Sequence, residues 1–244
     1  MNRNTMSGQY SKITLTLAVL SMLIYLLASS YIDYPITTIL KPTPIIFLIL
    51  FSLRNHEPAT KGLLFAALSF SFLGDAVLTL PFQLSLQITI LSFILAQCAY
   101  ILLFLKIASF QKKRLSIFIV ILATLAFGFY ILYPYLGEMK VPVMIYTCWL
   151  IPMIFCALHV KQHTPIVTLG ALLFLFSDLT FALNRFIFDN DRLISILEMY
   201  LYYSAQFLLV LGTSQHTTYH PKHSEEPSES SFDQESREPS LHTG

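Results

Sequence analysis

The sequence has little charge. Only 12% of its 244 residues are Asp, Glu, Lys or Arg, while 55% are hydrophobic. A soluble domain carries about 25% charged residues, so this composition excludes a soluble globule, and its hydrophobicity excludes a disordered chain. The same composition excludes a basic nucleic-acid-binding protein, and we expect no nucleic-acid partner. A helical membrane protein remains.

Cysteines and metal-binding patterns are also scarce. Cys98, Cys148 and Cys156 lie inside apolar runs without metal-ligand spacing, which excludes a disulfide scaffold. The chain has no Gly-x-Ser-x-Gly motif, and its apolar runs hold no His cluster, so a serine or zinc lipid hydrolase has no support. We expect neither a metal nor another cofactor.

Long apolar runs are abundant. A transmembrane helix needs about 20 mostly apolar residues, and eight segments qualify: 13–30, 36–53, 62–80, 84–105, 115–136, 141–160, 165–184 and 193–212. The sequence therefore predicts an all-α fold, a polytopic bundle of eight transmembrane helices. This domain, 13–212, lies between a short N-terminal segment, 1–12, and a C-terminal tail, 213–244.

Basic residues predict the orientation of the bundle. Cytoplasmic loops carry an excess of Lys and Arg. With eight spans, most basic residues fall on the side of the N-terminus: Arg3, Lys12, Arg54, Lys61, Lys106, Lys112, Lys113, Arg114, Lys161, Lys222 and Arg237. Only Lys140, Arg185 and Arg192 lie on the other side. We therefore predict that both termini are cytoplasmic.

The composition changes abruptly at residue 213. The tail is rich in charge and histidine and nearly lacks hydrophobic residues, which is typical of a disordered extension. His216, His220 and His223 could bind a metal weakly, but solvated side chains are the interpretation we adopt.

Four ionisable residues stand out within the apolar runs: Lys41, Asp75, Asp178 and Glu198. Charges inside a bilayer are costly, so each is a functional hypothesis. Counted at about 1.5 Å per residue along helices of alternating direction, all four lie at a similar depth in the non-cytoplasmic half. Tyr146 falls at the same level. This shared depth predicts one buried polar site.

Local spacing supports such a site. Asp75 lies one helical turn from both Ser71 and Thr79, and Glu198 begins a second polar stripe that reaches Gln206. A buried ion pair with the lysine would explain some of these groups, but three carboxylates exceed one lysine. Low dielectric favours the neutral form of a surplus carboxylic acid. A neutral acid beside an ionised one suits acid–base catalysis and equally a proton-coupled carrier.

Several short motifs resemble the YhhN-like family of eight-helix membrane proteins, which includes the mammalian lysoplasmalogenases. They occur in order over residues 13–212: Lys41-Pro42-x-Pro44; Phe70-Ser71-Phe72-Leu73-Gly74-Asp75; Tyr146 with Met153 and Ala157; Phe176-Ser177-Asp178 with Ala182 and Phe186; and Tyr202-Tyr203-Ser204-Ala205-Gln206. One departure is Gln97, which precedes Tyr100 by three residues where the family often has His. By depth, Gln97 should lie away from the carboxylate layer.

The resemblance implies a hydrolase of the vinyl ether bond of lysoplasmalogens, an integral protein of the bacterial inner membrane that takes a lysophospholipid from the bilayer. Protonation of the vinyl β-carbon gives an oxocarbenium ion, and water then yields a fatty aldehyde and glycerophosphoethanolamine or glycerophosphocholine. Asp75 and Asp178 are the expected catalytic pair, comparable with the carboxylates of glycosidases. Which of them is the acid stays open, because a coupled pair titrates as a unit.

Further residues are expected to bind substrate: Lys41, Tyr146, Glu198, Tyr203 and Gln206. Glu198 is assigned from its depth alone. Lys41 would hold one aspartate ionised or contact the phosphate, for which Arg185 and Arg192 in an outer loop are alternatives. Interfacial snorkelling is the competing interpretation of both arginines.

Two other functions use membrane carboxylates. A proton-coupled carrier of a lipid or small amphiphile should show broken helices near mid-membrane in two repeats, and Pro42 and Pro44 are candidates for one break. An intramembrane aspartyl protease is disfavoured, because Phe72-Leu73-Gly74-Asp75 lacks the first glycine of Gly-x-Gly-Asp and Ser177 precedes the second aspartate.

Overall fold

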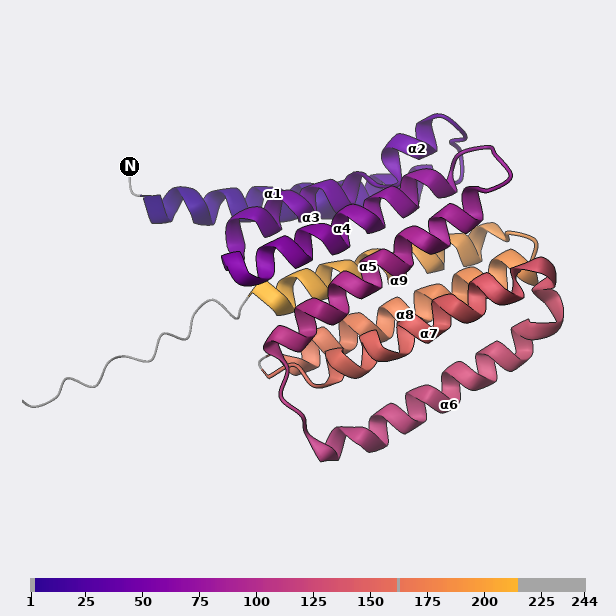
Figure 1. The fold of residues 1–244 in the computed structure, drawn as a ribbon. Coiled ribbons are helices and arrows are strands. Elements are labelled where there is room, and N and C mark those ends of the chain that lie inside the picture. Colours follow the sequence, from indigo (N-terminus) through magenta and orange to yellow (C-terminus); the bar gives the residue numbers. More distant parts are fainter. Residues whose placement is uncertain (1–2, 162, 215–244) are drawn as a thin grey trace, which may run out of the picture.

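The computed structural model describes residues 3–161 and 163–214, which are mostly helical (Figure 1). The α-helices are α1 (Arg3–Ala28), α2 (Ile36–Leu40), α3 (Thr43–Asn55), α4 (Pro58–Leu78), α5 (Ser85–Ile107), α6 (Leu115–Leu132), α7 (Lys140–Leu158), α8 (Thr164–Phe186) and α9 (Arg192–Ser214). Short 3-10 helices, Lys112–Arg114, Tyr133–Tyr135 and Gly137–Met139, flank α6 and precede α7. The described residues form no strand beyond one isolated bridge between Ala108 and Val160.

Eight helical segments are long and apolar enough to span a membrane, which confirms the predicted count. The chain is therefore an integral membrane protein. The first helix begins at Arg3, ahead of the predicted start at residue 13. Of the predicted tail, all but Thr213 and Ser214 lies outside the described residues.

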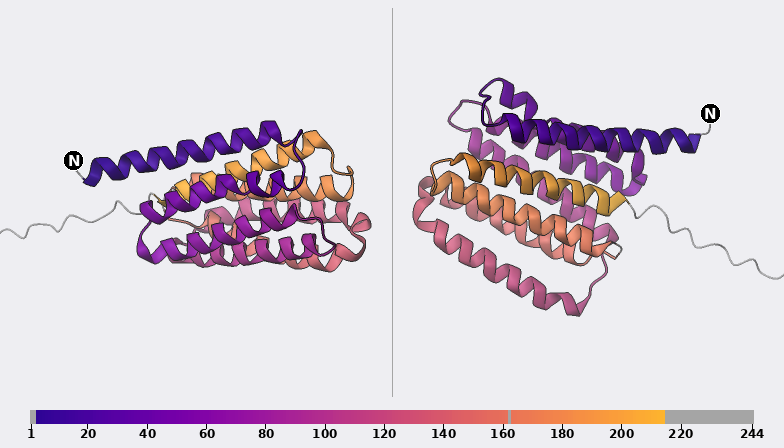
Figure 2. Two further views of the ribbon diagram at one scale, coloured as in Figure 1. Left: turned by 90° about the horizontal axis from the view of Figure 1, so that it is seen from above. Right: turned by 180° about the vertical axis from the view of Figure 1, so that it is seen from behind.

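The first residues of α1 and the last of α9 lie at the same end of the bundle, as an even number of spans requires (Figure 1). We call this the terminal end and the opposite one the far end. Consecutive spans run antiparallel (Figure 1), and the most extensive contacts join α8 to α9 and α4 to α5. Helix α6 stands at one edge of the bundle (Figure 1 and the right view of Figure 2), and it meets the bundle where Gly128 approaches Leu179.

The segment predicted as one span over 36–53 is broken into α2 and α3 at Lys41 and Pro42. Proline lacks a backbone N–H and disrupts the hydrogen bonds of a helix. The Ile45 N–H bonds to the carbonyl of Pro42 instead of that of Lys41, at 3.0 Å. The Lys41 carbonyl accepts a 2.6 Å hydrogen bond from the Tyr203 hydroxyl on α9. The break therefore fixes Lys41 against α9.

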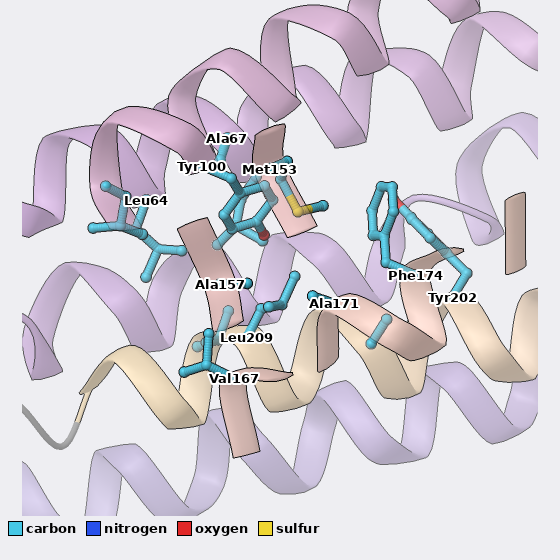
Figure 3. Close-up of a cluster of buried hydrophobic side chains, with 14 of the residues drawn as sticks. Leu64, Ala67, Tyr100, Met153, Ala157, Val167, Ala171, Phe174, Tyr202 and Leu209 are labelled. Atoms are coloured by element: carbon cyan, nitrogen blue, oxygen red, sulfur yellow. The ribbon is translucent and has the colours of Figure 1, made fainter. Parts of the chain in front are cut away.

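The core is a continuous cluster of buried apolar side chains contributed by most of the helices (Figure 3). Two glycines let α8 and α9 pack closely: a Cβ at Gly212 would lie 2.6 Å from Cγ2 of Val167, and a Cβ at Gly170 would lie 3.0 Å from Cδ2 of Leu209. Such small residues are typical of closely packed membrane helices. This packing holds the polar stripes of α8 and α9 in fixed register.

Candidate active site

A cavity of about 90 Å³ lies among α4, α5, α7, α8 and α9. Its walls include all five groups that were predicted to share one depth: Lys41, Asp75, Tyr146, Asp178 and Glu198. The remaining lining is largely apolar, including Phe93, Phe181 and Val143. The structure thus brings the predicted layer of ionisable groups into one enclosed space, which we call the reaction cavity.

Asp75 is 2% exposed and is held from two sides. The Tyr202 hydroxyl on α9 donates a hydrogen bond to Asp75 Oδ2 at 2.8 Å. The preceding Gly74 lets α5 approach, because a Cβ there would lie 2.8 Å from the Phe93 ring, and Thr89 on α5 donates to the Gly74 carbonyl at 3.2 Å. The carboxylate therefore has a fixed direction and one oxygen, Oδ1, left for a ligand.

Asp178 is held in the same way from another helix. The Tyr146 hydroxyl on α7 donates a hydrogen bond to Asp178 Oδ2 at 2.6 Å. The neighbouring Ser177 hydroxyl donates to the Glu198 carbonyl at 3.1 Å, which fixes α8 against α9. Each aspartate of the site is thus paired with one tyrosine that lies on a different helix.

Lys41 supplies the positive charge of the reaction cavity. Its side chain is buried and lines the wall that also carries Glu198. The ammonium attracts the carboxylates of Asp75 and Glu198. Asp178 is instead influenced by the Tyr146 hydroxyl and the Glu198 carboxylate. The two aspartates therefore differ in their electrostatic surroundings.

Two of the predicted substrate-binding residues lie behind the cavity wall. Tyr203 is buried and bonds the Lys41 carbonyl. Gln206 is also buried; it accepts a 2.6 Å hydrogen bond from the Tyr100 hydroxyl and donates to Ser71 Oγ at 3.1 Å. In this arrangement both side chains position other groups, and direct contact with a substrate stays a prediction.

Two residues gain importance from the structure. The sequence placed Tyr202 in a polar stripe and in a family motif, but its bond to Asp75 could not be read from spacing. Gln97 was expected away from the carboxylates, yet its amide faces the Tyr146 hydroxyl. Its Oε1 and Nε2 are buried and have no partner of good hydrogen-bond geometry among the described residues. The signal in the sequence was that Gln97 stands where the family often has His.

Over residues 3–161 and 163–214, no group of three His, Cys, Asp or Glu side chains is placed to hold a metal ion. The three tail histidines named above lie outside these ranges.

These features define the class of the protein: a polytopic membrane protein with an acidic cavity buried among its spanning helices. The chain belongs to the YhhN family, whose family model matches residues 36–213, from the start of α2 almost to the end of α9. A search of curated proteins and a search of solved structures gave no match. The first helix precedes the matched range.

Proposed function

We propose that the protein is a lysoplasmalogenase, which hydrolyses the vinyl ether bond of lysoplasmalogens to a fatty aldehyde and glycerophosphoethanolamine or glycerophosphocholine. This proposal rests mainly on one observation: Asp75 and Asp178 line the same buried, mostly apolar cavity, and a tyrosine orients each of them. Membership of the YhhN family is consistent with this hydrolase activity.

The first chemical step is proton transfer to carbon. Asp178 has no cation among its strong electrostatic neighbours, so we assign it as the acid that protonates the vinyl β-carbon. The carbon–carbon double bond supplies the electron pair for the new C–H bond, and positive charge develops on the ether oxygen and adjacent carbon. A positioned general acid typically contributes about 10²- to 10⁴-fold in rate.

Asp75 supplies the opposite charge. Lys41 lines the same cavity as this carboxylate, and the Tyr202 hydroxyl fixes its direction. A carboxylate so placed stabilises the oxocarbenium ion and then accepts a proton from the attacking water. The resulting hemiacetal collapses to the aldehyde and the free glycerol hydroxyl. Preorganised charge of this kind is worth about 10²- to 10³-fold.

The bilayer would deliver the substrate. The apolar walls contributed by α5, α7 and α8 suit the single hydrocarbon chain of a lysolipid.

We further propose that the bundle lies in a bacterial inner membrane with its terminal end in the cytoplasm. The Lys and Arg residues in the loops at that end support this orientation. Cysteines introduced at Asn190 and at Gln111 test this orientation: in intact cells an impermeant maleimide should label only Asn190→Cys, and preferential labelling at Gln111→Cys would contradict it.

The test is aldehyde release by the purified full-length protein from lysoplasmenylethanolamine. Asp75→Asn and Asp178→Asn keep the side-chain shape, and each should reduce release at least 10²-fold. Glu138→Gln, which removes an exposed carboxylate at the far end, should keep full activity. Unchanged release in both aspartate variants, with Glu138→Gln as reference, would refute the catalytic assignment.

A proton-coupled carrier remains the alternative outcome of the same experiment. Of the two helix breaks that this alternative requires, α2 and α3 show one. The corresponding helix of the second half, α7, runs unbroken through Pro152, which favours the hydrolase. Uptake of intact lysolipid into proteoliposomes without aldehyde formation would establish the carrier instead.

A further inference from the structure

A second cavity adjoins the reaction cavity toward the far end. It has a volume of about 400 Å³ and shares Lys41, Glu198 and Met199 with the reaction cavity. Its own walls are polar. They include Ser29, which follows α1, and a group of residues from the end of α8, the loop after it and the start of α9: Asn184, Arg185, Asn190, Arg192 and Ser195. We call this space the vestibule.

Two guanidinium groups give the vestibule a positive wall. Arg185 Nη1 donates to Asn190 Oδ1 at 3.3 Å, and the Arg192 guanidinium lies 5.3 Å from the centroid of the Tyr31 ring. Among the described residues, neither arginine forms an ion pair with a carboxylate. Arginine is well suited to phosphate because its planar fork donates two parallel hydrogen bonds. The vestibule is therefore built for an anion.

The vestibule also contains an unsatisfied acceptor. Asn184 is 3% exposed, and its Nδ2 donates to the Asp191 carbonyl at 3.1 Å and to Ser195 Oγ at 2.8 Å. Its Oδ1 is buried and has no partner among the described residues. Buried polar atoms are nearly always hydrogen-bonded. A ligand that carries both an anion and a hydroxyl group would complete this wall.

We propose that the vestibule binds the glycerophospho group of the lysolipid, with its phosphate on Arg185 and Arg192 and its free glycerol hydroxyl donating to Asn184 Oδ1. This inference rests on the proposed function, because it names how that substrate is held. It assigns to the two arginines a role beyond snorkelling at the membrane surface.

The spacing fits this substrate. Arg185 follows Asp178 by two turns on the same face of α8, about 10 Å along the helix. The ether oxygen and the phosphorus of a lysolipid are about 6 Å apart in an extended glycerol backbone. The Arg185 side chain leans toward the N-terminus of its helix, back toward Asp178, and can cover the difference. The vinyl ether can therefore lie at the aspartates while the phosphate lies at the arginines.

Direct binding tests the vestibule without relying on catalysis. The probe is a saturated 1-O-alkyl lysophosphoethanolamine, which has no vinyl ether to hydrolyse, and the comparison is the 1-O-alkylglycerol of the same chain length. Detergent-solubilised full-length protein should bind the phosphate-bearing probe at least about tenfold more tightly. Arg185→Gln and Arg192→Gln should each reduce that preference severalfold, while Lys140→Gln should not. Lys140 is a matched control because it lies at the same end over the Tyr133 ring, away from the vestibule.

A second probe examines the acceptor without altering the protein. A 2-deoxy analogue of the phosphate-bearing probe should bind wild-type protein about tenfold more weakly, because it leaves Asn184 Oδ1 unpaired. Equal affinity of wild-type protein for the phosphate-bearing probe and the alkylglycerol would overturn the assignment. Binding of inorganic phosphate alone as tightly as the lysolipid probe would also overturn it, because the site would then be one for free phosphate.

The two proposals fail in different ways. Aldehyde release without a phosphate preference refutes the vestibule assignment alone. A phosphate preference lost in the arginine variants, without aldehyde release, refutes the hydrolase and leaves the vestibule as a lysophospholipid-binding site.

Discussion

The Tyr146 hydroxyl lies 2.6 Å from Oδ2 of Asp178 and thereby ties α7 to the face of α8 that lines the reaction cavity. Tyr202 holds Asp75 in the corresponding way from α9. Both hydroxyls use Oδ2 and leave the other carboxylate oxygen for the reacting atoms. The site is thus two oriented carboxyl groups facing one cavity.

Removing either hydroxyl should lower turnover more than binding. Tyr146→Phe and Tyr202→Phe are each expected to reduce kcat for aldehyde release about tenfold, the rate equivalent of one charge-assisted hydrogen bond. KM should change little, because the apolar rings remain. Tyr200→Phe is the matched control, since Tyr200 is 52% exposed on the same helix as Tyr202. Equal kcat in all three variants would contradict the orienting role.

The different surroundings of the two aspartates can be measured as a coupling energy. Lys41→Met should lower the free energy of unfolding by about 3 kcal/mol, because it leaves buried carboxylates without their cation. The loss should be smaller in the Asp75→Asn background, since one of the two carboxylates that neighbour the ammonium is then neutral. In the Asp178→Asn background it should be nearly unchanged. Thermal unfolding of the single and double variants in detergent gives a double-mutant cycle for each aspartate. Equal coupling of Lys41 to both aspartates would refute the assignment of Asp178 as the acid.

Much of this arrangement was predictable from the sequence. Apolar run length predicted the eight spans because the bilayer thickness fixes helix length, and counting along antiparallel helices placed Lys41, Asp75, Asp178 and Glu198 in one layer. Side-chain direction was not predictable. Depth cannot distinguish Tyr202, which bonds Asp75, from Tyr203, which turns to the Lys41 carbonyl.

The break between α2 and α3 shows a second kind of limit. Proline permits a break at Pro42, but Pro152 lies inside an unbroken α7, so the proline alone does not decide. What differs is the tertiary contact. The break leaves the Lys41 carbonyl without its helical hydrogen bond, and the Tyr203 hydroxyl donates to it instead. The vestibule was predictable only in part. Arg185 and Arg192 were candidate phosphate contacts, but Asn184 joins them in one cavity wall only because the start of α9 lies beside the end of α8.

The close packing of α8 and α9 gives a stability prediction. Gly212→Ala places a methyl group 2.6 Å from Cγ2 of Val167 and 3.2 Å from its backbone nitrogen, and should lower the free energy of unfolding by about 1–3 kcal/mol. Gly62→Ala is the matched control, because nothing lies within 4 Å of a Cβ there. That variant should gain about 0.5–1 kcal/mol from the better helix former. Thermal unfolding that ranks the two variants the other way would show that α8 and α9 do not pack as described.

A buried histidine between two spans predicts a pH dependence. Burial is the main reason that the pKa of His56 is lowered from the usual 6.5 to about 4. The unfolded chain therefore binds a proton between pH 6.5 and 4 that the folded protein does not. The stabilising contribution of neutral His56 is complete above pH 6.5 and is lost as the pH falls toward 4.

The measurement is the melting temperature of wild type and His56→Gln at several pH values in that range. The wild type should lose more stability on acidification, so the difference between the two proteins should shrink as the pH falls. Parallel curves would show that protonation of His56 is not linked to unfolding. The ring nitrogens lie 3.2 Å from the Ser52 carbonyl and from Thr213 Oγ1, contacts that the glutamine amide can partly replace.

Hydrolysis in heavy water tests the central claim most directly. If an acid in the reaction cavity protonates the vinyl β-carbon, the aldehyde trapped at early times should carry one deuterium on the carbon next to the carbonyl. The glycerol oxygen released from the ether should show no exchange when the reaction is run in ¹⁸O-labelled water. Mass spectrometry of both products gives the answer. An aldehyde without deuterium, or ¹⁸O in the glycerol hydroxyl, would contradict protonation of the vinyl ether by the buried aspartates.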